Sequence, residues 1–109
     1  MVRRLLASTG MQRILVVLRG PIEIDQLRRR WAAALAGVSG PYELAVCLVL
    51  GEGDDGLRHA VRAQRDLTAA LRVAVGTAAE TIAVFVASER DGYGVDDCAR
   101  DWGATVVVA

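Results

Sequence analysis

Four short apolar runs recur along the chain, and none shows the alternation of apolar and polar residues that marks a half-buried strand. Each run is four to seven residues long. Continuous apolar runs of this length are typical of strands that are covered on both faces of a sheet. They predict buried strands at Ile14–Leu18, Leu44–Leu50, Ile82–Val86 and Thr105–Val108.

The segments between these runs carry apolar residues at the spacing of amphipathic helices. They predict helices over Leu27–Val38, Leu57–Val75 and Val95–Trp102, each closed by a nearby glycine. Strands and helices therefore alternate from the first strand to the last. This alternation predicts an α/β fold, an open doubly wound parallel sheet of four strands and three helices with right-handed crossovers.

Length and charge narrow the class of protein. A chain of 109 residues with 53% hydrophobic residues suits one folded domain and not a disordered segment. Thirteen basic and thirteen acidic residues cancel, whereas proteins held on nucleic acid or anionic membranes by bulk charge are usually basic. No apolar run approaches the roughly 18 residues of a membrane span, and Met1–Ala7 is too short for a signal peptide. We expect a soluble cytoplasmic protein that binds neither nucleic acid nor membrane.

Residues for catalysis or metal binding are few. Cys47 and Cys98 are 51 residues apart, outside any CxxC pattern, and His59 is the only histidine. Neither a zinc site nor a Cys–His nucleophile is easily built from them. We expect Cys47 to pack as a small apolar side chain and His59 to face solvent. No serine stands in a GxSxG motif, so we predict no enzymatic activity.

A glycine-rich loop before the second helix holds three acidic residues. Carboxylates are the ligands that hard cations prefer, but the spacing does not match an EF-hand loop. A cap at the start of the helix is the simpler interpretation, and we predict no metal site. The acidic residues are Glu52, Asp54 and Asp55.

Arginines form two clusters on the predicted helices. A basic stripe can bind nucleic acid, but no aromatic residue lies among these arginines to stack on bases. Asp66 follows Arg62 by four residues, which suits an ordinary solvated helix face. We adopt that simpler interpretation for both clusters, Arg58, Arg62, Arg65 and Arg72 on the second helix and Arg28, Arg29 and Arg30 on the first.

The turn after the first strand, Arg19-Gly20-Pro21, lies where open α/β sheets usually bind ligands. It has neither of the glycine-rich phosphate loops, GxGxxG or GxxxxGK[ST]. Arg19 can pair with a phosphate or a carboxylate. A solvated arginine at a turn is the simpler interpretation.

Several segments resemble the universal stress protein family, a branch of the adenine-nucleotide-binding α/β sandwiches. The resemblance covers residues 11–109, which we take as a single domain, with residues 1–10 as an N-terminal extension. It implies the strand order 3-2-1-4 for the four predicted strands, and family members commonly dimerise through the last strand. The matching segments are Gln12–Leu18, Trp31–Ala36, Glu43–Leu50 and Val95–Val108, the last with Gly103-Ala104-Thr105 before its strand.

Two features of the family's nucleotide site differ here. Members that bind ATP usually carry an aspartate just after the first strand, where this chain has Arg19-Gly20-Pro21. They also carry a G-x2-G-x9-G-[ST] phosphate motif after the fourth strand, which is not found here. We therefore expect no cofactor and no ATP binding. The alternative is an adenine-nucleotide-binding stress-response protein whose pocket includes Arg19, Gly20 and Val49.

The resemblance also predicts how the chain associates. Without the family's fifth strand and fourth helix, right-handed crossovers leave only the short third helix on one face of the sheet. That face would be under-covered, and the last strand would be an unprotected apolar edge. We predict a homodimer or higher homo-oligomer, or a protein partner, with apolar residues of segment 1–10 adding to the contact. A third interpretation is a regulatory module of a larger transporter or sensor. The residues predicted to associate are Thr105, Val106, Val107 and Val108.

Overall fold

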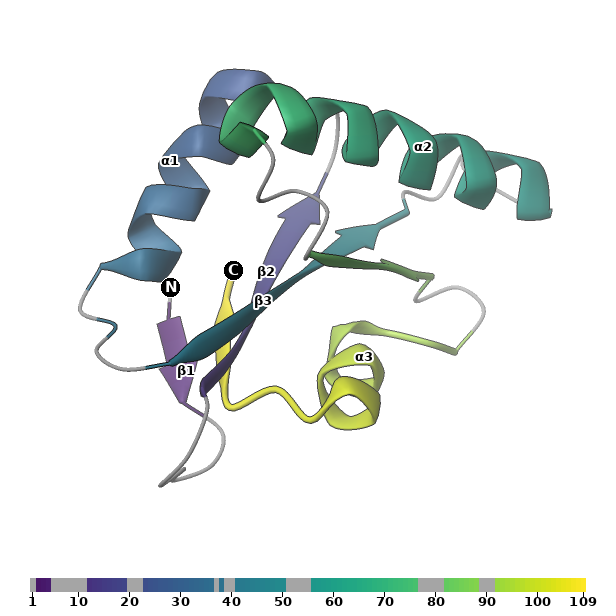
Figure 1. Cartoon of the computed structure of the whole chain (residues 1–109). Coiled ribbons are helices and arrows are strands. Elements are labelled where there is room, and N and C mark those ends of the chain that lie inside the picture. The colour runs from purple at the N-terminus through teal and green to yellow at the C-terminus, as the bar shows by residue number, and fades with distance from the viewer. Residues whose placement is uncertain are drawn as a thin grey trace.

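The computed structural model of the chain (Figure 1) contains one sheet with helices on both of its faces. For two short stretches, residues 2–4 and 56–60, it describes the backbone alone. The described residues are 2–4, 12–19, 23–36, 38, 41–50, 56–76, 82–88 and 92–109.

The sheet contains five strands in the described part of the chain. Their order across the sheet is β1-β5-β2-β3-β4, and the four strands from β5 to β4 run parallel. The four predicted strands correspond to β2, β3, β4 and β5. The predicted order 3-2-1-4 and the parallel α/β fold are therefore confirmed. The strands are β1 (Val2–Arg4), β2 (Gln12–Arg19), β3 (Tyr42–Val49), β4 (Ala83–Ala87) and β5 (Val106–Val108).

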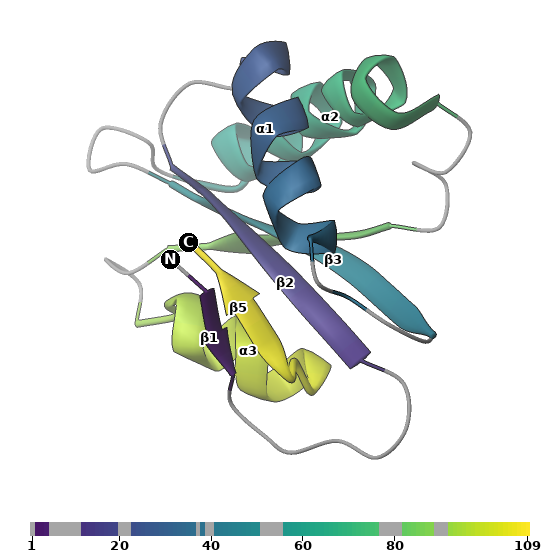
Figure 2. The same cartoon turned by 90° about the vertical axis from the view of Figure 1, so that its left-hand side faces the viewer.

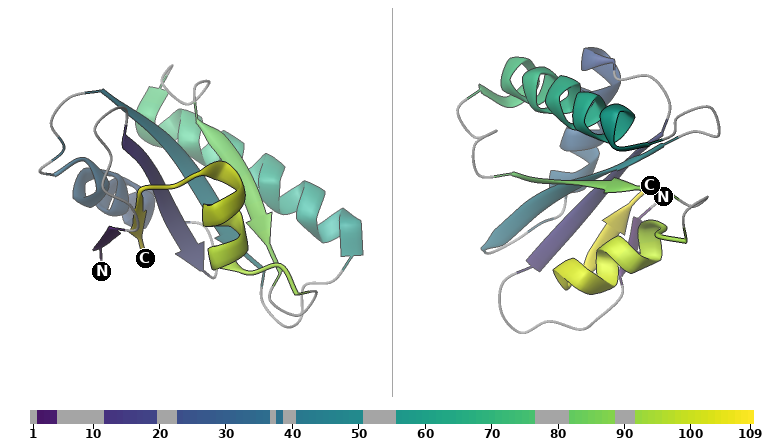
Figure 3. Two further views of the ribbon diagram at one scale, coloured as in Figure 1. Left: turned by 90° about the horizontal axis from the view of Figure 1, so that it is seen from below. Right: turned by 90° about the vertical axis from the view of Figure 1, so that its right-hand side faces the viewer.

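The three helices divide between the faces as the crossovers predicted. Both α1 (Ile24–Leu35) and α2 (Gly56–Val75) cover one face, and α3 (Val95–Trp102) covers the other (Figure 3). Glycines in the left-handed backbone region follow two of them: Gly76 after α2 and Gly103 after α3. No helix in the described ranges combines the length and apolar character needed to cross a membrane.

Two buried clusters explain why the strand sequences are continuously apolar. Alternate residues of a strand point to opposite faces, and both faces of this sheet are covered. On β2, Ile14 and Val16 pack beneath α1 and α2, whereas Leu15 and Val17 pack beneath α3. Every position of the strand centre is therefore apolar.

The α3 face is better covered than we predicted. The central residues of this face on β2 and β3 are buried, and Leu15 and Cys47 are fully so. The residues at the strand ends, Arg13, Arg19 and Glu43, are exposed. A short helix suffices because several sheet residues beneath it are small, among them Ala45 and Ala87. The prediction of an under-covered second face is therefore wrong for the centre of the sheet. On the edge strand β4, the same face has Ala83 exposed and Phe85 half-buried.

Polar contacts fix α3 at both ends. The Gly94 backbone N–H donates to Asp97 Oδ2 at 2.9 Å at its start. At its end, Arg13 Nη1 donates to the Trp102 carbonyl oxygen at 2.7 Å, and the guanidinium lies 5.8 Å from the centre of a Trp102 ring. The ring of Phe85 on β4 lies 6.4 Å from that of Trp102. These contacts link α3 to β2 and β4.

The last strand is not an open edge. Strand β1 pairs antiparallel with β5, with Val2 opposite Val108 and Arg4 opposite Val106 (Figure 2). The prediction that Thr105–Val108 forms an unprotected edge is therefore wrong, because the first residues of the chain already occupy it. Residues 2–4, part of the predicted N-terminal extension, belong to the sheet.

Candidate functional site

The carboxyl edge of the sheet brings together two of the three residues predicted to form a nucleotide pocket. Arg19 and Val49 end β2 and β3 and lie directly opposite each other in the register. The Val49 side chain is buried on the α3 side, whereas Arg19 is exposed. Gly20 lies outside the described residues. The structure thus places one cation at the usual ligand position of an open α/β sheet.

The two cysteines, Cys47 on β3 and Cys98 on α3, belong to the same buried cluster and are free thiols. Burial, followed by the neighbouring Cys98 thiol, raises the pKa of Cys47 from the ordinary 9.0 to about 12. Cys47 therefore stays protonated at neutral pH, and a protonated thiol is a poor nucleophile. Its packing as a small apolar side chain is confirmed.

One exposed tyrosine lies beside α3. The Tyr93 hydroxyl donates to Asp101 Oδ2 at 2.8 Å, and this hydrogen bond raises the pKa of Tyr93. A hydroxyl held in its protonated form in this way is not poised to act as a base. The contact fastens the segment before α3 to the end of that helix.

The acidic loop lies outside the described residues, so the structure does not place Glu52, Asp54 or Asp55. His59 lies on α2, but its side chain is also outside what the structure describes. Among the described side chains, no group of three or more His, Cys, Asp and Glu residues is placed to hold a metal ion.

The opposite edge of the sheet from β1 is formed by β4. It pairs with β3 on one side, and no described strand pairs with the other side. The Ala87 carbonyl accepts from the Leu50 N–H at 2.9 Å, so the backbone polar groups of Ala87 face β3. Because these groups alternate in direction along a strand, those of Val84 and Val86 face outward. The exposed edge reads Ala-Val-Phe-Val-Ala, without a charge or a proline.

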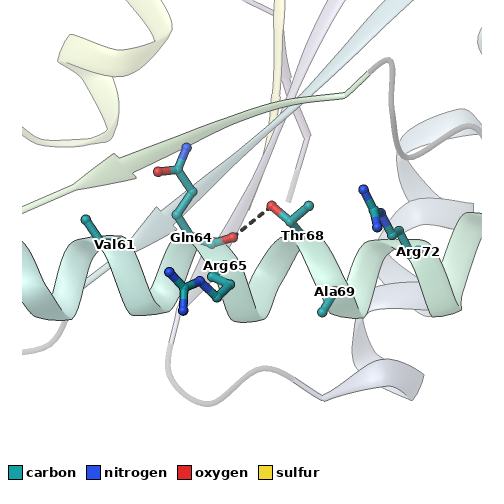
Figure 4. Close-up of a pocket in the computed structure, with 6 residues that line it drawn as sticks. All are labelled: Val61, Gln64, Arg65, Thr68, Ala69 and Arg72. Atoms are coloured by element: carbon teal, nitrogen blue, oxygen red, sulfur yellow. Dashed lines mark hydrogen bonds between the residues drawn. The ribbon is translucent and has the colours of Figure 1, made fainter.

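A side chain of α2 reaches this edge. Gln64 Nε2 donates to the Val84 carbonyl oxygen at 3.4 Å, which confirms that this carbonyl points away from β3. The backbone carbonyl oxygen of Gln64 accepts a hydrogen bond at 2.8 Å from Oγ1 of Thr68, one turn further along the helix. Figure 4 shows the Gln64 and Thr68 side chains on the side of α2 where the ribbon of β4 lies. The helix and the edge strand therefore form one continuous surface.

A shallow hollow of about 550 Å³ runs along this flank of α2. Arg65 and Arg72 are exposed and stand apart along the helix (Figure 4). Neither takes part in the ion pairs of the described residues. Asp66 and Arg62 are also exposed, and no ion pair joins these two described side chains. We call this surface the α2/β4 groove: the edge residues Val84 and Val86 together with the lining residues Val61, Gln64, Arg65, Thr68, Ala69 and Arg72.

The arginine cluster on α1 makes more contacts with described residues than the one on α2. Arg28 Nη2 donates to the Val73 carbonyl oxygen at 3.5 Å, and Arg28 Nη1 lies 4.0 Å from Asp25 Oδ1. Arg29 is exposed and Arg30 half-buried on α1. This cluster matches the solvated helix face that the sequence predicted.

A second cavity, of about 360 Å³, lies at the amino ends of the strands. Trp31, Leu35 and Leu44 contribute apolar walls, and the one charged lining residue among those described, Glu43, faces Arg13 at 3.8 Å. This cavity is therefore mostly apolar, with few polar groups among its described lining residues that could orient a ligand.

No family model, curated protein or solved structure matches the chain. The α2/β4 groove was not singled out by the sequence pattern. The predicted strand order already placed the third strand at an edge, and Arg65 and Arg72 already stood in the predicted stripe, but their common location depends on how α2 crosses β4.

Proposed function

We propose that the protein is a binding module for another polypeptide, which it engages along the α2/β4 groove. The observation that carries this proposal is the open edge of β4, whose outward backbone groups meet Gln64 as their one described side-chain partner. An uncharged, apolar edge strand is a ready template for pairing with another strand. The cytoplasmic location and the lack of catalysis that the sequence predicted belong to the same proposal.

Self-association through β5 is no longer available, because β1 occupies that edge. A protein partner was the other route that the sequence allowed. The resemblance to universal stress proteins then concerns the scaffold, with β4 in place of the last strand as the contact.

The experiment is a screen of short extended peptides against the ¹⁵N-labelled protein, read from its amide resonances. We expect binding peptides to shift the Val84 and Val86 amides, since these N–H groups would acquire partners. Val86→Pro removes one outward N–H and should abolish binding, whereas Val86→Ala keeps the N–H and should preserve it. Peptides that shift amides elsewhere, or a screen without any binder, would refute the proposal.

A second candidate is adenine-nucleotide binding at the carboxyl edge. The specific observation in its favour is the cross-strand pair of Arg19 and Val49. Isothermal titration with ATP, ADP and AMP tests it. Micromolar binding that Arg19→Ala weakens supports this candidate, and no measurable heat at millimolar nucleotide rules it out.

A further inference from the structure

We infer that the bound polypeptide is an acidic, extended segment that adds to β4 as a further strand and places two carboxylates against Arg65 and Arg72. This inference rests on the proposed function and specifies its partner. Three arguments support it: the charge of the groove, the spacing of the two arginines, and the repulsion expected if a second copy of the chain paired with β4 instead.

The groove is basic although the chain as a whole is neutral. Arg62, Arg65 and Arg72 are exposed on this part of α2, and no described residue pairs with any of them. The acidic residues of α3, including Asp96 and Asp97, lie on the other face of the sheet. A guanidinium forms two parallel hydrogen bonds with a carboxylate, so unpaired arginines beside an open edge favour an acidic strand.

The spacing of the arginines suggests a pattern for that strand. Arg65 and Arg72 are seven residues apart on α2, which corresponds to about 10.5 Å along the helix axis. Strand residues on one face recur every two positions, and four positions span about 13 Å. Flexible arginine side chains cover the difference. Thr68 and Ala69 lie between the arginines and are small, so we expect acidic–x–small–x–acidic.

A second copy of the chain is a poorer occupant. If β4 paired antiparallel with its symmetry mate, each α2 would approach the other α2, because α2 flanks this edge (Figure 3). Arg65 and Arg72 would then approach the arginines of the mate, and like charges across a contact oppose association. Nucleic acid is disfavoured because no described lining residue of the groove is aromatic, so bases have nothing to stack on.

The test compares three peptides of equal length: one with two glutamates in this pattern, one with glutamines in their place and one with lysines. Fluorescence anisotropy gives the affinities at low and high salt. Each Arg–carboxylate pair should contribute about fivefold in affinity, so the glutamine peptide should bind about 25-fold more weakly. The lysine peptide should bind weakest, and salt should weaken the glutamate peptide most.

Variants of the protein identify the site. Arg65→Gln and Arg72→Gln should each weaken the glutamate peptide about fivefold and leave the glutamine peptide unchanged. The matched control is Arg29→Gln, an exposed arginine on α1 outside the groove, which should leave both affinities unchanged. Thermal unfolding verifies that each variant is folded.

The outcomes separate this inference from the proposed function. If the glutamate and glutamine peptides bind equally and both shift the Val84 amide, the acidic partner is refuted and the peptide-binding module stands. If no peptide shifts that amide, both fail. A dimer of the protein alone that Val86→Pro dissociates, or a single-stranded oligonucleotide that binds more tightly than the glutamate peptide and loses affinity in Arg65→Gln, overturns the inference in favour of that occupant.

Discussion

The two outermost strands of the parallel part of the sheet, β5 and β4, differ in how their outer sides are paired. At one edge, β1 pairs with all three residues of β5 and leaves that strand between two neighbours. At the other, β4 has a strand on one side, and a hydrogen bond from Gln64 is the described side-chain contact on its outer backbone. The sequences of β4 and β5 are both apolar and uncharged, so composition does not explain why β5 has a described strand on its outer side and β4 has none. The strand that covers β5 and forms that edge of the sheet is β1, Val-Arg-Arg.

The comparison shows that protecting an apolar edge takes few residues. Three residues of β1 suffice for β5. Natural edges are usually paired, covered, charged or interrupted by proline. Along Ala83–Ala87, β4 has neither a charge nor a proline, and no described strand pairs with its outer side. Arg65 and Arg72, which form no ion pair with any described residue, lie on the helix beside this strand. We therefore regard the open edge as the contact surface and the closed edge as part of the scaffold.

The largest loss of stability is expected in β5, the strand that lies between β1 and β2. Val107→Pro should lower the free energy of unfolding by about 3 kcal/mol or more, because proline cannot donate to the ladder and β5 lies between β1 and β2. Urea unfolding followed by circular dichroism measures this loss. A loss below about 1 kcal/mol would mean that β5 is not an interior strand.

A smaller effect is expected at the junction of β5 with β2. Thr105 Oγ1 accepts from the Arg13 backbone N–H at 3.0 Å, and Thr105 is buried. Thr105→Val keeps the shape but leaves that N–H unpaired, at a cost of about 2 kcal/mol. Thr105→Ser retains the hydroxyl and is the matched control. Equal stability of the valine and serine variants would contradict this account.

The interior of the sheet should also respond to alkaline pH. The unfolded Cys47 thiol ionises above pH 9.0, whereas the folded thiol stays protonated up to about pH 12. The unfolded state therefore binds fewer protons in this window, and the folded state loses about 1.4 kcal/mol per pH unit relative to Cys47→Ala. Denaturant unfolding of both proteins from pH 8 to 11 measures the difference, and parallel pH profiles would contradict burial of this thiol.

At the open edge, the same proline substitution should be tolerated. Val86→Pro removes an N–H that points away from β3, so we expect a loss of about 1 kcal/mol, from packing alone. Phe85→Pro removes an N–H that faces β3 and should cost about 3 kcal/mol. Urea unfolding of the pair measures the contrast directly. Equal losses would show that both sides of β4 are bonded.

Much of the fold could be predicted because its signals are local and redundant. Continuous apolar runs such as Ile14–Leu18 are typical of strands covered on both faces, and glycines such as Gly76 and Gly103 end two of the helices. Strand β1 could not be predicted, because Val-Arg-Arg is too short to show a period and its pairing partner is more than 100 residues away. The cover over the α3 face depended on how small residues such as Ala45 pack beneath Trp102 and its helix.

The candidate site was only partly predictable for a related reason. The register that places Arg19 beside Val49 follows from strand order and strand ends, which the sequence indicated. The α2/β4 groove depends on the crossing of a helix over an edge strand. The hydrogen bond from Gln64 to Val84 shows that α2 lies over β4. The spacing of residues within α2 does not indicate which strand the helix crosses.

Residue-resolved amide hydrogen exchange of the unliganded protein tests the contrast between the edges most directly. The outward N–H groups of Val106 and Val108 face β1 and should exchange slowly, whereas those of Val84 and Val86 should exchange at rates close to those of an unstructured peptide. Slow exchange at Val84 and Val86, comparable with that in β5, would show that the β4 edge is already occupied and would contradict the account.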